Sequence, residues 1–177
     1  MIILIKPTKE YEDELRAFID EMIASGDTHI NGSGAYEEYP TFEEWMKYLD
    51  SYKDRRTIKP GSDRVEGSQW VLVDDEKHRV LGMANIRHYL NDYLLREGGH
   101  IGYSIRPSER GQGYGHRQLE LALGVLRKLG LTKALVTCDD DNVASYCTIE
   151  SCGGVLENTV LIPGETKPVR RYWISLE

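Results

Sequence analysis

The residues with the clearest chemical potential are Arg110-Gly-Gln-Gly-Tyr-Gly115, which lie between a predicted strand and a predicted helix. Three glycines in five positions let the backbone turn tightly and leave its N–H groups uncovered by side chains. At the start of a helix these N–H groups have no partner within the helix, and the helix dipole adds positive potential. The segment is therefore suited to hold an anion, most often a phosphate or pyrophosphate.

Two common phosphate-binding motifs do not account for this loop. A dinucleotide fingerprint requires G-x-G-x-x-G directly after a strand, but His116 stands where the last glycine is needed. A P-loop requires Gly-Lys-Ser/Thr, which the chain lacks here. Two alternatives stay open from the loop alone: a nucleotide-binding module that holds ADP, and a glycine-rich turn that binds nothing.

The elements around the loop are predicted from apolar periodicity. Apolar residues from Leu119 to Leu129 mark one face of a helix that Gly130 ends. Before the loop, strands over residues 69–74, 79–88 and 100–106 form an antiparallel meander. Elsewhere we expect strands over residues 2–6, 134–138, 155–162 and 169–176, and helices over about 11–25, 41–52 and 142–152. This order predicts a single mixed, mostly antiparallel sheet of about six to seven strands flanked by helices, in the α/β (α+β) class.

The loop and its neighbours resemble the GNAT acetyltransferase superfamily. Arg110-x-x-Gly113-x-Gly115 is similar to that family's acetyl-CoA loop, and Gly102-Tyr-Ser-Ile105 with Pro107 occupies the place of its pantetheine-binding strand. The segments Leu135–Cys138, Asn142-x-x-Ser145 and Gly153-Gly154 are similar to its next strand and helix. The specific match covers residues 69–160, and the N-terminal third fits in element order only. The resemblance implies a single GNAT domain over residues 1–177 with a sheet splayed into a V.

The resemblance also implies acetyl-CoA as the acetyl donor and no metal. Where two neighbouring strands diverge, their unpaired backbone groups can bind the amide-bearing pantetheine arm as if it were a strand. The backbone of the glycine loop would hold the pyrophosphate. The residues expected to bind the cofactor are Tyr103, Ser104, Ile105, Arg110, Gly111, Gln112, Gly113, Tyr114, Gly115, Asn142 and Ser145.

For catalysis, the family implies direct transfer of acetyl to a primary amine of a small molecule or peptide. An ammonium must lose a proton before it attacks, and the nearest candidate bases are Glu97, His100 and His88. Many family members carry a tyrosine acid seven residues after the helix asparagine, a position held here by Ile149. Tyr146, one turn earlier, is the alternative acid. Because of Ile149, a catalytically silent acyl-CoA-binding or sensor domain stays open as the second function.

Three polar connections, residues 27–40, 53–68 and 90–99, are expected to recognise the acceptor. Within the first, Tyr36, Glu37, Glu38 and Tyr39 could form an acidic, aromatic rim for a cation. The alternative is a solvated loop with two packed tyrosines.

Length and composition limit the partners. The 177 residues suggest one domain, and a net charge of −7 argues against nucleic acid or an anionic membrane as a partner. There is no apolar run of about 20 residues and no basic leader, so we expect a cytoplasmic protein. The three cysteines lack CxxC spacing, which signals neither a disulfide framework nor a zinc site. A homodimer is compatible with the sequence, but no sequence feature indicates one.

Overall fold

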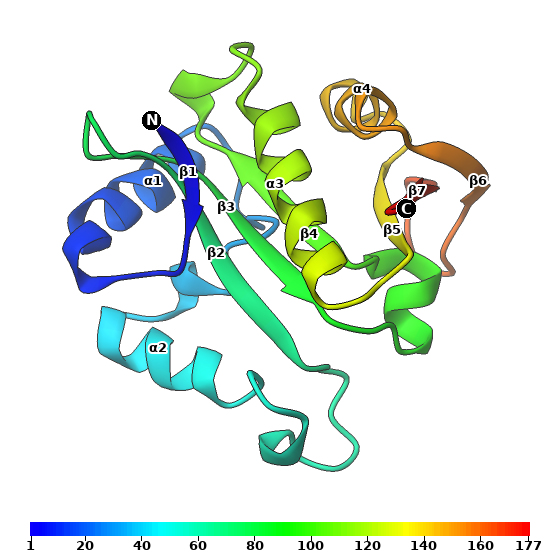
Figure 1. Ribbon diagram of the computed structural model, residues 1–177, viewed down its shortest axis with the longest axis horizontal. Coiled ribbons are helices and arrows are strands. Elements are labelled where there is room, and N and C mark those ends of the chain that lie inside the picture. The colour runs from blue at the N-terminus through cyan, green and yellow to red at the C-terminus, as the bar shows by residue number, and fades with distance from the viewer.

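Seven strands form two antiparallel sheets in the computed structural model, which describes all residues 1–177 (Figure 1). The larger sheet has the order β1-β2-β3-β4, and the smaller has the order β5-β7-β6. The strands are β1 (Ile2–Ile5), β2 (Gly67–Asp74), β3 (Arg79–Arg87), β4 (Ile101–Ile105), β5 (Lys133–Asp139), β6 (Val155–Val160) and β7 (Val169–Ser175). The predicted fold class and strand count are confirmed, but the strands form two antiparallel sheets instead of the single mixed sheet that was expected. The edge strands that face each other are β4 and β5.

Four α-helices cover these sheets: α1 (Glu12–Ala24), α2 (Phe42–Asp50), α3 (Tyr114–Lys128) and α4 (Val143–Ser151). The predicted capping box opens α2, since the Thr41 side chain accepts a hydrogen bond from the Glu44 N–H. The 90–99 connection, predicted as irregular, contains one π-helical turn over Leu94–Gly98. No helix is both long enough and apolar enough to cross a membrane.

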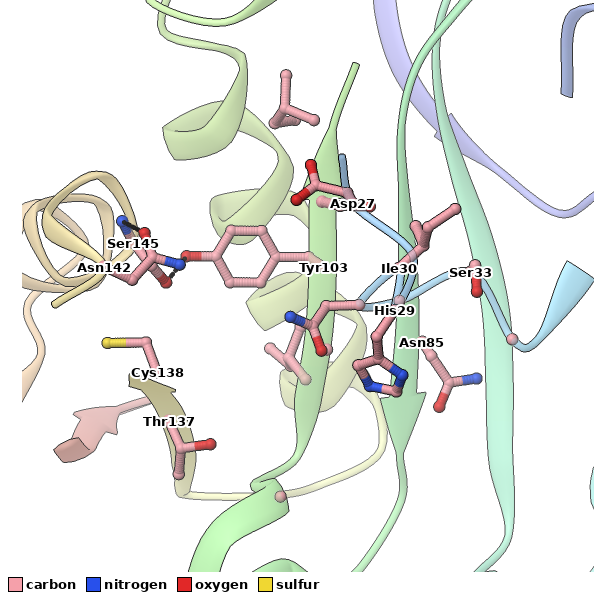
Figure 2. Close-up of a pocket in the computed structure, with 18 of the residues that line it drawn as sticks. Asp27, His29, Ile30, Ser33, Asn85, Tyr103, Thr137, Cys138, Asn142 and Ser145 are labelled. Carbon is pink, nitrogen blue, oxygen red and sulfur yellow. Dashed lines mark hydrogen bonds between the residues drawn. The ribbon is translucent and has the colours of Figure 1, made fainter. Parts of the chain in front are cut away.

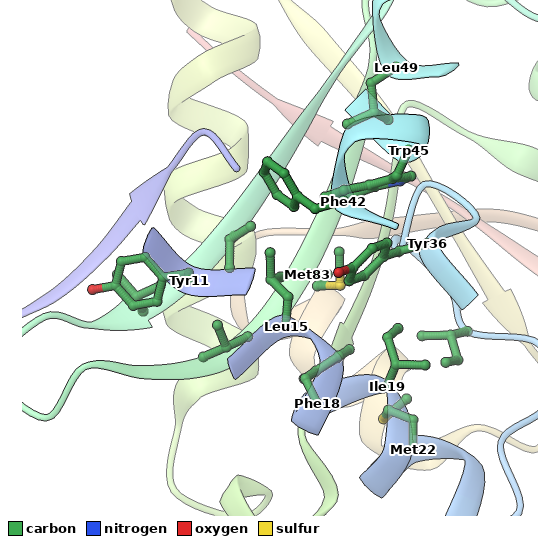
Figure 3. Close-up of a cluster of buried hydrophobic side chains, with 14 of the residues drawn as sticks. Tyr11, Leu15, Phe18, Ile19, Met22, Tyr36, Phe42, Trp45, Leu49 and Met83 are labelled. Carbon is green, nitrogen blue, oxygen red and sulfur yellow. The ribbon is translucent and has the colours of Figure 1, made fainter. Parts of the chain in front are cut away.

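Two hydrophobic cores lie on opposite faces of the larger sheet. Helices α1 and α2 pack on one face, where Phe18, Tyr36, Trp45 and Met83 are fully buried (Figure 3). Helix α3 packs on the other face, and its apolar stripe joins residues of α4, β5 and β7 in a second core. Since β-strand side chains alternate between faces, Met83 enters the first core and Ile86 the second. The sheet is therefore covered on both sides, and its β4 edge is directed toward β5.

The two sheets meet at one end of β4 and β5. There the His100 N–H donates to the Leu135 carbonyl at 2.7 Å, and the Leu135 N–H donates to His100 Nδ1 at 2.9 Å. Gly99 has a φ of +66°, and a Cβ on it would lie 2.8 Å from the Leu135 carbonyl oxygen, so this close approach requires glycine. Beyond this junction β4 and β5 belong to separate sheets. The two sheets diverge from this junction, and together they form the V that the resemblance implied.

Candidate active site

A groove of about 1040 Å³ runs along the gap between β4 and β5. One part is lined by the start of α3, by β4 and β5, and by the first turn of α4. The other part is lined by the 27–40 connection, by β3 and by the 93–98 turn. Figure 2 shows side chains from both parts around β4, including Tyr103, His29 and Asn85. The groove thus joins the predicted cofactor loop to all three connections expected to recognise the acceptor, with Asp63, Arg64 and Val65 lining it from the 53–68 connection.

The start of α3 offers an anion site made of backbone groups. No backbone carbonyl accepts a hydrogen bond from the N–H groups of residues 111–116. Gly111 and Gly113 have φ values of +74° and +83°, which glycine adopts without strain and which turn the chain into the helix. Six consecutive N–H groups at the positive end of a 15-residue helix are well suited to bind a phosphate group.

The side chains of this loop differ in their relation to the groove. Arg110 lines it, but its guanidinium donates to the Ile105 carbonyl at 3.1 Å and pairs with Asp27 at 3.0 Å. Arg110 therefore holds the loop against β4 and the 27–40 connection. Gln112 does not line the groove, and its side chain donates to Glu109 at 3.3 Å. Gly111, Gly113, Tyr114 and Gly115 all line it.

The edge of β4 that faces the gap carries free backbone groups. The Arg106 N–H donates to Leu81 and the His100 carbonyl accepts from Arg87, so the even-numbered residues of β4 pair with β3. Because antiparallel pairing alternates, the backbone groups of Tyr103 and Ile105 point toward the gap. The Ile105 carbonyl already accepts from Arg110, so the free groups are both backbone groups of Tyr103 and the N–H of Ile105. Ser104 instead presents a buried hydroxyl without a hydrogen-bond partner. These are the groups that could bind an amide-bearing chain lying in the gap.

Across the gap, α4 supplies hydroxyl and amide groups. Asn142 caps this helix, because its side chain accepts a hydrogen bond from the Ser145 N–H at 3.1 Å. The Tyr103 hydroxyl lies 3.2 Å from the Ser145 hydroxyl and so bridges β4 and α4 (Figure 2). Burial raises the pKa of Tyr103 to about 12 and that of the Cys138 thiol to about 11. Both groups therefore carry their protons at neutral pH.

Three of the four residues expected to move protons, His88, Tyr146 and His100, lie outside the groove. His88 is half-buried, with Nδ1 3.1 Å from the Glu66 carboxylate and Nε2 3.1 Å from the Ser68 hydroxyl. Tyr146 is half-buried in the second core with the Arg170 guanidinium 4.0 Å from its ring centroid, and Ile149 is fully buried there. His100 is buried at the junction of the sheets, where burial lowers its pKa to about 4 and Leu135 occupies its Nδ1. Tyr146 therefore packs in the second core, and His100 takes part in the hydrogen bonds that join the two sheets.

Glu97 does line the groove, and so does His29, which the sequence reasoning did not single out. Glu97 is paired with Arg96 at 2.9 Å. His29 is exposed and comes from the connection that was predicted to contact the acceptor (Figure 2). The sequence signal for this residue was a histidine within a connection expected to contact the acceptor. The sequence does not show that His29 lines the groove, because this depends on how closely the backbone at Gly32 approaches Gly102 and Met83.

Of the four residues that could form an acidic, aromatic rim, only the two glutamates line the groove. Glu37 and Glu38 line the groove, and the Ser33 hydroxyl donates to Glu37 at 2.6 Å. Tyr36 is instead fully buried with its ring centroid 4.4 Å from that of Trp45, and Tyr39 stacks on Tyr48 at 5.0 Å. Both rings pack against α2, which agrees with the alternative of two packed tyrosines that the sequence left open. The structure contains no group of three metal-ligating side chains.

Comparisons with known proteins agree with this geometry. A family model described as an acetyltransferase (GNAT) domain matches residues 4–155, whereas no curated protein matches the chain. An N-acetyltransferase from Staphylococcus aureus Mu50 is 18% identical with a TM-score of 0.63, covering 100% of this chain and 99% of that one. The spermidine/spermine N-acetyltransferase SpeG from Vibrio cholerae is 18% identical with a TM-score of 0.62, covering 99% and 95%. The yncA protein from Salmonella typhimurium, solved with its cofactor acetyl-CoA, is 14% identical with a TM-score of 0.61, covering 99% and 94%. At these identities the structures share a fold.

Proposed function

The chain belongs to the GNAT acetyltransferase family, and we propose that it transfers an acetyl group from acetyl-CoA directly to a primary amine of a small molecule or peptide. The observation that carries this proposal is the continuity of one groove. It runs from six free backbone N–H groups at the start of α3, along the free edge of β4, to a cavity lined by acidic side chains. These three parts of the groove match, in the same order, a pyrophosphate, an amide-bearing arm and an amine.

The donor half of the groove fits acetyl-CoA. The N–H groups of residues 111–116 would hold the pyrophosphate, and the backbone of Tyr103 and Ile105 would bind the pantetheine amides. Asn142 and Ser145 would contact the arm from the opposite side. Bound acetyl-CoA supplies a thioester carbonyl that an amine can attack and a thiolate that can leave.

The group that removes a proton from the acceptor ammonium is expected in the acceptor half of the groove. His29 and Glu97 both line it, but Glu97 already has Arg96 as its partner. We assign the base to His29, which takes the ammonium proton directly or through a water molecule. The neutral amine nitrogen then forms a bond to the carbonyl carbon, and the carbon–sulfur bond breaks as the thiolate leaves. As the amide forms, the nitrogen releases its second proton to water, which balances the proton that the thiolate takes up.

The departing thiolate is assigned a proton from Tyr103. Its hydroxyl lies between β4 and α4, lines the groove and is protonated at neutral pH. The family position for this acid, Ile149, is buried in the second core, so a phenol reaching from β4 takes its place. Ser145, 3.2 Å from the phenol, orients it.

A covalent route through a cysteine has less support. Cys138 lines the groove, but burial raises its pKa to about 11, so its reactive thiolate form is scarce at neutral pH. Cys147 is exposed on α4 and does not line the groove. Direct transfer needs no acyl-enzyme.

We also propose a cytoplasmic location, which accords with the finding that all three cysteines are free.

The proposal is tested by measuring release of the coenzyme A thiol over a panel of amino acids, polyamines, simple amines and peptide N-termini. We expect acetyl-CoA consumption that depends on one class of amine. Calorimetry with acetyl-CoA, ADP and NAD separates the alternatives. Tight acetyl-CoA binding without turnover would indicate a sensor domain, and equal affinity for ADP would indicate a nucleotide-binding module.

A further inference from the structure

A guanidinium without an acidic partner lies in the acceptor half of the groove. Arg87, at the end of β3, lines this half, and one of its terminal nitrogens donates to the Gly98 and Gly99 carbonyls at 3.1 and 3.4 Å. Both of these acceptors are backbone carbonyls, and no carboxylate forms a hydrogen bond or an ion pair with Arg87. Arg87 thus keeps unused donors beside a cavity.

The groups around Arg87 add to its positive character. Arg64 also lines the groove, and its guanidinium stacks on the rings of Tyr48 and Tyr52 at 4.9 and 5.4 Å from their centroids. The Tyr52 hydroxyl is buried and has no hydrogen-bond partner, and burial raises its pKa to about 12, so it remains a donor. Two cations and a neutral hydroxyl therefore gather at one end of the cavity.

The backbone leaves room for this arrangement. A Cβ on Gly102 would lie 3.1 Å from a terminal nitrogen of Arg87, so the glycine in β4 lets the guanidinium lie close to the strand. Asp63 comes from the same segment as Arg64 and lines the groove, but it accepts no hydrogen bond from Arg87.

Arg87 is half-buried and contacts only backbone carbonyls, so no opposite charge repays the part of its desolvation that burial causes. Holding the Gly98–Gly99 turn occupies one nitrogen of the three in the guanidinium. The remaining donors form a fork suited to a planar carboxylate or to a phosphonate oxygen pair. An incoming anion would supply the missing counter-charge.

We propose that the acceptor amine carries a small anionic group, a carboxylate or a phosphonate, which Arg87 binds together with Arg64 and Tyr52. This inference rests on the proposed acetyl transfer. It adds a second recognition point to the groove, since Glu37 and Glu38 attract the ammonium while Arg87 fixes the anion. Amines without an anion, polyamines among them, are then poor acceptors.

The test compares matched pairs of compounds in the presence of coenzyme A. Calorimetry measures binding of N-acetylated amino acids and aminophosphonates against the N-acetylated amines that lack the acidic group. We expect the anionic member of the best pair to bind about 10- to 100-fold more tightly, as one charged hydrogen-bonded contact would give. Carboxylate and phosphonate arms show which anion the site prefers, and either preference supports the inference.

Variants show whether Arg87 is responsible. R87M and the exposed R64M should each reduce the preference, whereas R56M, an exposed arginine paired with Asp54 outside the groove, should leave it unchanged. If R87M does not fold, R64M and the charge-retaining R87K still report on the site, since lysine lacks the fork. Equal binding of both members of every pair by the unmodified protein would overturn the inference.

The thiol-release assay distinguishes failure of this inference from failure of the proposed function. Turnover of amines without preference for an anion would leave acetyl transfer standing and remove the anion site. Tighter binding of the anionic compounds without turnover of any amine would support the anion site and contradict acetyl transfer.

Discussion

Leu135 and His100 exchange two hydrogen bonds, one between backbone groups at 2.7 Å and one from the Leu135 N–H to the His100 ring at 2.9 Å. This pair ties the edge of the larger sheet to the edge of the smaller one. Because the donor to Nδ1 is a backbone N–H, the ring is neutral and carries its proton on Nε2. The groove opens where this pairing stops, so the His100 side chain fixes the closed end of the V.

We predict that H100A lowers the free energy of unfolding by about 1–3 kcal/mol, because the buried Leu135 N–H loses its acceptor. Urea denaturation at pH 7 measures this change. The pH dependence follows from the folded-state pKa of about 4, which lies below the usual 6.5. Protonation is favoured in the unfolded state, so the contribution is complete above pH 6.5 and declines toward pH 4. An H100A protein with the same acid dependence as the unmodified one would contradict this position for His100.

For Tyr103 we predict that Y103F lowers kcat by about 10- to 100-fold, because the thiolate loses its proton donor. S145A is the matched control, since it removes the same hydrogen bond but keeps the phenol. Its effect on kcat should be several-fold smaller. Steady-state kinetics with saturating acetyl-CoA measures both. Equal losses in the two variants would mean that the hydrogen bond, and not the phenol proton, is what catalysis needs.

His29 is predicted to act as the base, so H29Q should reduce kcat by about 100-fold, because the glutamine amide cannot accept a proton from the ammonium. E97Q is the control, because Glu97 also lines the groove but is paired with Arg96. Steady-state kinetics with saturating acetyl-CoA compares the two variants with the unmodified protein. A large loss of kcat in E97Q with none in H29Q would assign the base to Glu97.

Acid stability is predicted to depend on the contact between α1 and the end of β4. Although burial alone would raise it, hydrogen bonds from Arg106 and Ser108 lower the pKa of Glu21 to about 2. A carboxyl with a lowered pKa stabilises the fold above about pH 4.5 and loses this effect as the pH falls toward 2. E21Q should therefore reduce stability by about 1–3 kcal/mol at pH 7 and flatten the acid limb of the unfolding profile. E120Q, which affects an exposed pair with Arg117, should change little, and a similar loss in both variants would refute the prediction.

Much of the fold follows from local features of the sequence. The glycines of the 110–115 loop, the apolar stripe of α3 and the capping box at Thr41 each specify a local conformation that the structure contains. The family resemblance is confirmed by the matching family model over residues 4–155. These features depend on neighbours within one or two helical turns, so a single sequence reveals them.

The site was less predictable, because its key contacts join distant segments. His100 is titratable and near the centre of the sheet, yet its partner is Leu135, and only tertiary packing shows that the ring is used for pairing. Tyr36 comes from a polar connection but is buried against Trp45. Arg87 appears in sequence as an ordinary charged residue at a strand end, and its lack of an acidic partner is visible only in three dimensions.

The central claim, direct acetyl transfer along the groove, is tested most directly by mass spectrometry of a single turnover with acetyl-CoA labelled in its acetyl group. We predict that the label moves to the nitrogen of an amine that carries an anionic group, with one free coenzyme A formed for each acetylated amine and no label on the protein. Label retained on Cys138 would contradict direct transfer. Acetyl-CoA that stays intact with every class of amine would contradict the proposed function itself.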